Sequence, residues 1–380
     1  MKANPLPAEG VLPDTLIRDA IESGWIVSNT GIQPEGIQPA SLDLRLGDVA
    51  YRLRSSFLPG KTTVWECLSE HQIGPEIPLK SGAVLERNRP YLIPLVEQLQ
   101  LPAGVRGRTN PKSSIGRLDI FTRVVVDRSP GFDEVPDGYQ GPLYLEIVSH
   151  SFTIQVKAGL SLNQIRLIHG NMEVSDRDIL RMHAQSPLVF TYENDDSDPH
   201  IPSELTVGNG LFLTVDLLEG ANKVIGYKAK ENSKLLDLSD ETGHAVRDFW
   251  EPVDPDGHNR LILEPEKFYL LVSTEGIAIP ADVAGEMTAY DPTSGELRTH
   301  YAGFFDPGFG QSASNGIVGS RAVLEVRAHE VPFALEHGQK IARLVFERMI
   351  RSPEKLYGPE IGSSYQNQRL KLSKFFRDSL

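Results

Sequence analysis

The sequence predicts a mainly β protein made of two related domains, and two observations support this prediction. First, 27 prolines and 33 glycines are spread over 380 residues, so short apolar runs end at turn-forming residues and long helical patterns are scarce. Second, several segments of the first half recur in the same order in the second half, which indicates an internal repeat.

The first predicted element is an amphipathic helix near the start of the chain. Ile17, Ala20, Ile21 and Trp25 fall on one helical face, and Asp14 is placed to cap the first turn. A loop rich in glycine, proline and glutamine follows this helix and should end it.

The rest of the first half is expected to be extended. Apolar and polar residues alternate strictly over 40–47, which predicts a half-buried strand that ends at a glycine. Further strands are predicted at 91–93, 143–147, 152–156 and 164–168.

The second half repeats this order of elements. A second capped helix is predicted at 175–180. The repeated pairs of segments are 41–47 with 214–220, 101–107 with 279–285, 145–150 with 324–329, and 164–167 with 341–344. We therefore expect two β-rich domains, residues 1–172 and 173–380.

Composition excludes several classes of protein. The formal net charge of -13 argues against a nucleic-acid partner, because an acidic surface repels phosphate backbones, although a local basic pocket could still bind a small phosphorylated ligand. The single cysteine, Cys67, allows no disulfide within the chain. No apolar run approaches the roughly 20 residues that a membrane helix needs, and no signal peptide is evident, so we expect a cytoplasmic protein without a membrane partner.

The candidate site combines an anion-binding segment with a carboxylate. Residues 112–117 are small, polar and basic, and their hydroxyls, backbone N–H groups and guanidinium can converge on phosphate oxygens. Glu146 lies between large apolar residues, where a carboxylate is costly unless it has a partner or a function. Together they predict general-base chemistry on a phosphorylated substrate. The alternative is an ordinary turn beside a solvent-facing glutamate.

The two halves differ at this segment. The counterpart of 112–117 is 290–295, which lacks the serine pair and the arginine and carries Asp291. We therefore expect the first domain to be specialised for chemistry, and the second for structure and for closing the site. The alternative is that Glu325, which matches Glu146, marks a scaffold glutamate in both domains.

The order of these motifs resembles that of deoxycytidine triphosphate (dCTP) deaminases, the zinc-independent relatives of trimeric dUTP pyrophosphatases (dUTPases). The segments that carry the resemblance are Ala-Ser-Leu-Asp-Leu-Arg-Leu-Gly at 40–47, Leu-Pro-Ala at 101–103, Lys-Ser-Ser-Ile-Gly-Arg-Leu at 112–118 and Leu-Glu-Ile at 145–147. The tail 364–368 is similar to the family's Lys-Tyr-Arg-Asn-Gln, which folds over the nucleotide. Covering nearly the whole chain, the resemblance implies the long duplicated form: two tandem dUTPase-like distorted β-barrels with short helices, the second of them degenerate.

The resemblance also implies a reaction and its residues. The reaction would be hydrolysis of dCTP to dUTP and ammonia, with Glu146 as general base, Ser113 holding the water and Arg117 ordering the site. The implied substrate contacts are Lys112, Ser114, Tyr365 and Gln368 at the phosphates, Asp137 at the sugar, and the backbone near Val124 and Val126 at the cytosine edge.

Two departures from the family pattern affect these assignments. Lys112 replaces an arginine, so a bidentate phosphate contact becomes a point charge. The hairpin after the serine pair is longer than in the family, where it ends in Ile-Asp-Pro-Gly-Trp-Ser-Gly. Asp127 is therefore an alternative to Asp137 as the sugar contact, although Asp-Gly-Tyr-Gln-Gly at 137–141 is the closer match.

Other deaminases activate water with zinc held by a His-x-Glu and a Pro-Cys-x-x-Cys motif, which a chain with one cysteine and no His-x-Glu does not contain. We expect no protein-held metal and no zinc, with Mg²⁺ accompanying the triphosphate. The implied partner is another copy of the chain in a homo-oligomer. The rival functions are a dUTP pyrophosphatase or bifunctional enzyme, and a nucleotide sensor without turnover.

Overall fold

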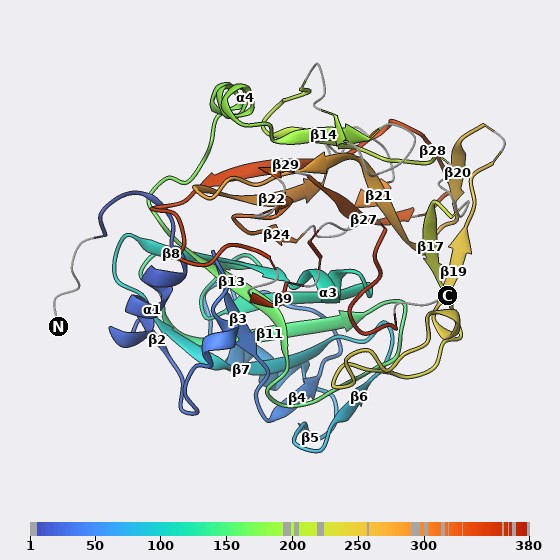
Figure 1. Ribbon diagram of the computed structural model, residues 1–380. Helices are drawn as coiled ribbons and strands as arrows, with labels where there is room; N and C mark the ends of the chain where they lie inside the picture. Colours follow the sequence, from blue (N-terminus) through green and yellow to red (C-terminus); the bar gives the residue numbers. More distant parts are fainter. Residues whose placement is uncertain are drawn as a thin grey trace.

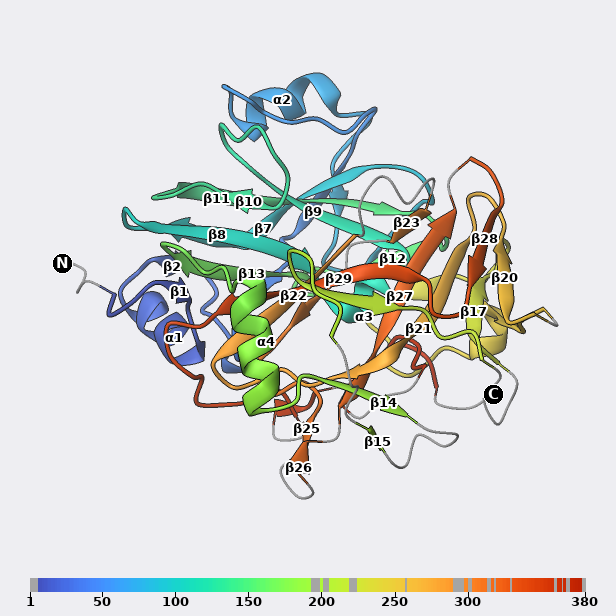
Figure 2. The same ribbon diagram turned by 90° about the horizontal axis from the view of Figure 1, so that it is seen from above.

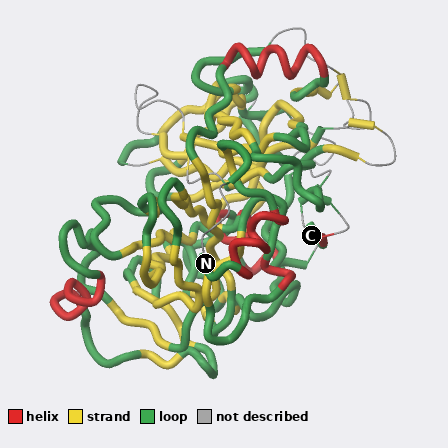
Figure 3. Tube along the Cα trace, turned by 90° about the vertical axis from the view of Figure 1, so that its left-hand side faces the viewer, coloured by secondary structure: helices red, strands yellow, loops and turns green. Residues whose placement is uncertain are grey.

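The computed structural model describes residues 6–192, 199–200, 205–218, 224–256, 258–289, 297–299, 303–312, 316–317, 319–328, 330–358, 361–363, 365–366 and 370–377. Most sheets belong to one of two groups, which are stacked on each other in Figure 1. Strands run through the body of the molecule, and helices α4 and α2 lie at the top and the left edge of the view in Figure 3. The predicted mainly β fold class is confirmed.

The first group contains two larger antiparallel sheets. One contains β1 (Gly10–Val11), β13 (Ser161–His169), β8 (Val105–Pro111) and β10 (Glu134–Val135), with β3 (Leu42–Arg45) on β13. The other contains β5 (Ile77–Pro78), β4 (Val49–Arg52), β7 (Tyr91–Gln100), β11 (Gln140–Ser149) and β9 (Ile120–Val126), with β2 (Ile26–Val27) on β7.

The second group has a similar layout, and a small sheet joins the two groups. The strands of its longer sheet are β15 (Pro199–His200), β14 (Val189–Tyr192), β21 (Phe268–Ile277), β17 (Gly226–Ala229) and β19 (Trp250–Val253), with β27 (Ser320–Ala328) on β21 and β23 (Leu297–Thr299) on β27. The other sheets are β16 (Leu211–Thr214), β29 (Lys340–Arg348), β22 (Val283–Ala289) and β24 (Phe304–Phe305); β20 (Arg260–Leu263) with β28 (Phe333–Glu336); and β25 (Gln311–Ser312) with β26 (Gly316–Ile317). The joining sheet is β18 (Leu236–Asp237), β12 (Ile154–Val156) and β6 (Ala83–Leu85).

The helices of the described residues are short, and one of them is largely buried between the sheet groups. They are α1 (Asp14–Glu22), α2 (Val64–His71), α3 (Ser113–Gly116) and α4 (Asp176–Gln185), with 3₁₀ turns at Pro34–Gly36 and Val246–Asp248. None of the helices in the described ranges is long and apolar enough to cross a membrane.

The predicted first helix is present, but its start differs from the expectation. Asp14 is the first residue of α1 and Pro13 is its N-cap, with no side-chain cap bond. The Asp14 carboxylate is almost fully buried and accepts the backbone N–H of Glu354 at 2.9 Å. Asp14 therefore connects the helix to the C-terminal segment at Glu354, a long-range contact that a local capping pattern does not reveal.

Helix α2 (Figure 2) was missed, although its sequence contains a start signal. Thr63 accepts the backbone N–H of Glu66, and Glu66 accepts the backbone N–H of Thr63, which forms a capping box. Only Val64 and Leu68 are buried in this helix, so the apolar periodicity is too short to stand out.

One buried and one partly buried ion pair join the two sheet groups. Arg166 on β13 is fully buried, and its guanidinium donates to Glu347 Oε2 at 2.6 Å and to the backbone carbonyl of Gly285 at 2.9 Å. Arg108 on β8 donates to Glu286 Oε2 at 2.9 Å. Arginines of the first half therefore meet carboxylates of the second, where a lost partner would leave a buried charge.

Candidate functional site

Helix α3 lies at the boundary between the two sheet groups (Figure 1). The chain leaves β8 at Pro111 and turns, with the N–H of Ile115 bonded to the carbonyl of Lys112 at 2.7 Å. Ile115 and Leu118 are buried in a hydrophobic core built mainly by the first half, which fixes the turn. With these apolar residues turned inward, Ser113 and Arg117 line a cavity shared with the second half.

This enclosed cavity has a volume of about 40 Å³ and combines residues from both halves with the C-terminal segment. Its lining is Ser113 and Arg117 from the first half; Met287, Gly303, Phe304, Phe305, Asp306, Phe309, Val323 and Glu325 from the second; and Tyr357 and Tyr365 from the C-terminal segment.

Arg117 is held between the tail and a carboxylate. Its side chain is buried, Nη1 donates to the carbonyl of Lys371 at 2.6 Å, and Cζ lies 3.7 Å from the centroid of the Tyr365 ring. Its positive charge also acts on Glu325, because it opposes the rise in the pKa of that carboxyl group. Arg117 therefore links the predicted tail contact to an acidic group.

Glu325 is one of the two carboxylates that line this cavity. It lies on β27, it is 5% exposed, and burial raises the pKa of its carboxyl group well above the usual value. An added Cβ on Gly116 would lie 2.5 Å from Oε1 and 2.6 Å from Oε2, so the carboxylate rests against the backbone of α3. Among the described residues, Oε2 has no hydrogen-bond partner.

A second, more open pocket of about 170 Å³ adjoins the enclosed cavity. Both share Ser113, Asp306, Tyr357 and Tyr365 in their linings. The second pocket adds charged and polar groups, which are Gln38, Asp43, Lys112, Ser114, Gln164, Ser363 and Lys374.

The two lysines of the open pocket are paired with carboxylates. Lys112 contacts Asp43, whose carboxyl pKa is raised by burial against the opposing charge of Lys112. Lys374 contacts Glu241. An anionic ligand entering this pocket would therefore compete with carboxylates for the two ammonium groups.

The structure brings only some of the predicted residues together. Lys112, Ser113, Ser114, Arg117 and Tyr365 line the two adjoining pockets. Gln368 lies outside the described residues.

Glu146 is not among the residues that line either pocket. It is buried on β11, and Arg123 on β9 donates Nε to its Oε1 at 3.1 Å and also contacts it through Nη2. The chain thus places this predicted base in an ion pair within the first half.

The backbone predicted to contact cytosine is paired within the long hairpin. The N–H of Val124 donates to Asp133 Oδ1 at 2.8 Å, and the N–H of Asp133 donates to the carbonyl of Val124 at 2.9 Å. Val124 and Val126 are both buried.

The two candidate sugar-contacting aspartates hold loops. Asp137 Oδ1 accepts the N–H of Gly104 at 3.0 Å, and Asp127 Oδ1 accepts the N–H of Val64 at 2.7 Å. Neither aspartate lines the two pockets around α3.

Comparison with known proteins places this arrangement in a family. The model of the 2'-deoxycytidine 5'-triphosphate deaminase N-terminal domain matches residues 8–171, and that of the C-terminal domain matches residues 175–376. The chain belongs to the 2'-deoxycytidine 5'-triphosphate deaminase family. The resemblance inferred from the sequence is thereby confirmed.

Solved and curated relatives differ in how much of the chain they cover. A crystal structure of 2'-deoxycytidine 5'-triphosphate deaminase from Agrobacterium tumefaciens is 46% identical and has a TM-score of 0.83, covering 90% of this chain and 99% of that one. Two curated relatives named "dCTP deaminase, dUMP-forming" are from Methanobrevibacter smithii, 29% identical over 36% of this chain, and a Parafrankia species, 33% identical over 32%. This chain spans 68% and 58% of their lengths, respectively.

Asp306 and Glu325 were missed as site candidates. A signal was present, because Phe305-Asp306-Pro307-Gly308-Phe309 is similar to the Ile-Asp-Pro-Gly-Trp segment of the deaminase family. The sequence prediction instead matched that family segment to the first-half hairpin that contains Asp127 and Asp137. Asp306 is nearly buried and lies 3.4 Å from Arg166 Nη2, which connects the cavity to the ion pairs between the halves.

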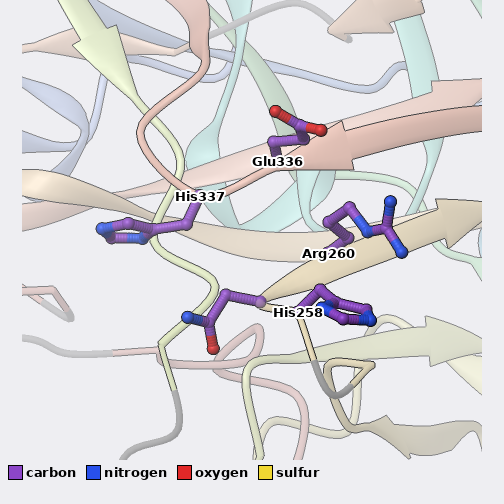
Figure 4. A pocket seen from close by; sticks show the side chains of 5 residues that line it. His258, Arg260, Glu336 and His337 are labelled. Atoms are coloured by element: carbon purple, nitrogen blue, oxygen red, sulfur yellow. The ribbon is translucent and has the colours of Figure 1, made fainter.

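Another pocket lies in the second half, where β20 begins and β28 ends (Figure 4). It is lined by His258, Asn259, Arg260, Glu336 and His337, and the labelled side chains spread apart instead of converging. In the part of the chain that the structure describes, no three His, Cys, Asp or Glu side chains are grouped to hold a metal ion.

Proposed function

We propose that this member of the deaminase family hydrolyses dCTP to dUTP and ammonia. The observation that carries the proposal is the composite cavity, which Ser113, Arg117 and a buried carboxylate line together with Tyr365. The adjoining pocket offers Lys112 and Lys374 for phosphate groups. The enclosed part has room for a water at the edge of a flat base, and the larger open part has room for the rest of the base and for phosphates.

The wider proposal keeps the organisation expected from the sequence. The chain is a tandem of two related domains, residues 1–172 and 173–380, which assembles as a homo-oligomer in the cytoplasm and has neither nucleic-acid nor membrane partners. Mg²⁺ arrives with the triphosphate as part of the substrate, and no zinc takes part. The tail with Tyr365 and Gln368 closes over the nucleotide.

The dUMP-forming reaction is a second candidate, because the curated relatives carry that name. It requires a water positioned at the α-phosphate in addition to the water at the base. From the sequence, Asp127 or Asp137 could hold the water at the α-phosphate, but both bond to backbone N–H groups away from the pockets. Asp306, by contrast, lines both pockets.

The test is product analysis with the purified full chain, dCTP and Mg²⁺. We expect equal amounts of ammonia and dUTP, unchanged by a chelator selective for zinc over magnesium. Formation of dUMP and pyrophosphate would favour the second candidate. Binding of dCTP without any ammonia would reject the enzyme and leave a nucleotide sensor.

A glycine substitution tests whether the close fit at α3 matters for deamination. A Cβ at Gly116 would approach both Glu325 oxygens within 2.6 Å, so Gly116→Ala should displace that carboxylate and lower kcat on the order of 10-fold to 100-fold. The matched control is Gly131→Ala, where an added Cβ meets nothing within 4 Å. Wild-type kcat in Gly116→Ala would show that the carboxylate position is unimportant.

A further inference from the structure

We infer that Glu325, supplied by the second half of the chain, is the general base of the deamination, and that Glu146 is not. This inference rests on the proposed function and identifies the residue that performs its central step. The first observation is position: Glu325 lies in the same enclosed cavity as Ser113 and Arg117, and Glu146 does not line it.

The hydrogen bonding of the two glutamates differs although their strand positions match. Glu146 pairs with Leu92 across β11 and β7, and Glu325 pairs with Leu270 across β27 and β21. In the described residues, Oε2 of Glu325 has no hydrogen-bond partner. A buried carboxylate oxygen without a donor is costly, and a water molecule that donates to it would remove that cost.

Glu146, by contrast, is neutralised by a neighbouring arginine. Arg123 contacts Oε1 through both Nε and Nη2, and its Cζ lies 4.2 Å from the centroid of the Phe132 ring. Oε1 of Glu146 is therefore already engaged in a charge-assisted contact, whereas Oε2 of Glu325 is left for a water molecule.

The surroundings of each glutamate also differ in what they offer a nucleobase. Near Glu146, the N–H and the carbonyl of Val124 are both bonded to Asp133 of the long hairpin. Near Glu325, the rings of Phe305 and Phe309 line the cavity and provide apolar surface for a flat ring.

The sequence is consistent with one complete site per chain. The first half retains Lys112 to Arg117, whereas its counterpart 290–295, which lies outside the described residues, has neither the serine pair nor the arginine. The first half therefore supplies the polar motif, and the second half supplies the carboxylate.

Glu325 carries protons in both stages of the proposed reaction. The water oxygen bonds to C4 of cytosine while Glu325 takes one water proton and passes it to the ring nitrogen N3. Glu325 then takes the proton of the new C4 hydroxyl and gives it to the amino group, the C4–N bond breaks, and ammonia leaves as the C4 carbonyl forms. The carboxylate is restored, and the raised pKa of Glu325 strengthens it as a base.

The experiment compares three variants of the full chain: Glu325→Gln, Glu146→Gln and the control Glu251→Gln, an exposed glutamate on β19. For each variant we would measure kcat for ammonia release and the Kd for dCTP with Mg²⁺. Glu325→Gln should lower kcat by about 10²-fold to 10⁴-fold and change the Kd only several-fold. Glu146→Gln should retain more than a tenth of wild-type kcat, and the control should be unchanged.

A pH profile separates a catalytic role from a structural one. Wild-type kcat should fall on the acid side as Glu325 becomes protonated, and residual activity of Glu325→Gln should lack this limb. If Glu325→Gln does not fold, Glu325→Asp is measured in its place. The aspartate keeps the negative charge on a shorter side chain, so kcat of this variant should still fall. Full activity of the Glu325 variant, or loss of turnover confined to Glu146→Gln, would overturn the inference. An inactive wild-type chain would instead reject the proposed function.

Discussion

Replacing Arg166 with methionine should lower the free energy of unfolding by about 3–5 kcal/mol, the loss typical when one partner of a buried ion pair is removed. Arg166 is fully buried, and its guanidinium contacts Glu347, Asp306 and the carbonyls of Gly285 and Phe305. In Arg166→Met these acceptors would lose their donor inside the protein. The measurement is urea-induced unfolding of the full chain.

A double variant tests the cause of that loss. Arg166→Met combined with Glu347→Leu removes the uncompensated carboxylate and should recover much of the stability, because well-packed apolar residues can replace a buried pair. The control is Arg181→Met, whose exposed pair with Asp178 should contribute no more than about 1 kcal/mol. Equal losses in Arg166→Met and the control would show that the buried pairs between the halves add little.

Replacing Arg117 with methionine should lower kcat for deamination by about 10²-fold to 10³-fold, the effect expected when a preorganised charged group is removed from a reaction centre. Arg117 contacts Tyr365 and the carbonyl of Lys371, and its charge acts on Glu325. Arg117→Lys should recover only part of the activity, because an ammonium lacks the planar guanidinium. The measurements are kcat, KM and the Kd for dCTP.

The same variant should change the pH dependence in a defined direction. The charge of Arg117 lowers the pKa of Glu325 against the larger effect of burial. Its removal should raise that pKa further, so the acid limb of kcat should move to higher pH. Arg54→Met, at an exposed arginine, should leave both kcat and the limb unchanged. An unshifted limb in Arg117→Met would contradict electrostatic coupling between the two groups.

The fold was predictable where a local pattern determines the structure. The alternation at 40–47 corresponds to β3, in which Leu42 and Leu44 are buried and Asp43 and Arg45 are not fully buried. Ser175 caps α4 as its pattern indicated, by accepting the N–H of Asp178 at 3.2 Å. Helix α2 was missed because a helix of eight residues with two buried side chains gives a weak periodic signal.

The candidate site was predictable only in part, for a physical reason. Ser113 and Arg117 are close in sequence, so one turn brings both to the same cavity. Which glutamate faces them depends on how the two halves pack. Sequence patterns show that Glu146 and Glu325 are equivalent, but they do not show which copy lies across from α3. The contacts of Arg166 and Arg108 with the second half contribute to that packing.

The two surfaces that form the cavity at α3, one from each half, belong to the same chain, and this affects how the cavity assembles. Ser113 and Glu325 belong to one polypeptide, and only the short stretch between β13 and α4 separates the two halves in sequence. Their encounter is therefore intramolecular, with an effective concentration on the order of millimolar for a short linker. Assembly of this cavity should thus be insensitive to dilution, whereas a site built between separate subunits would be lost as the subunits dissociate.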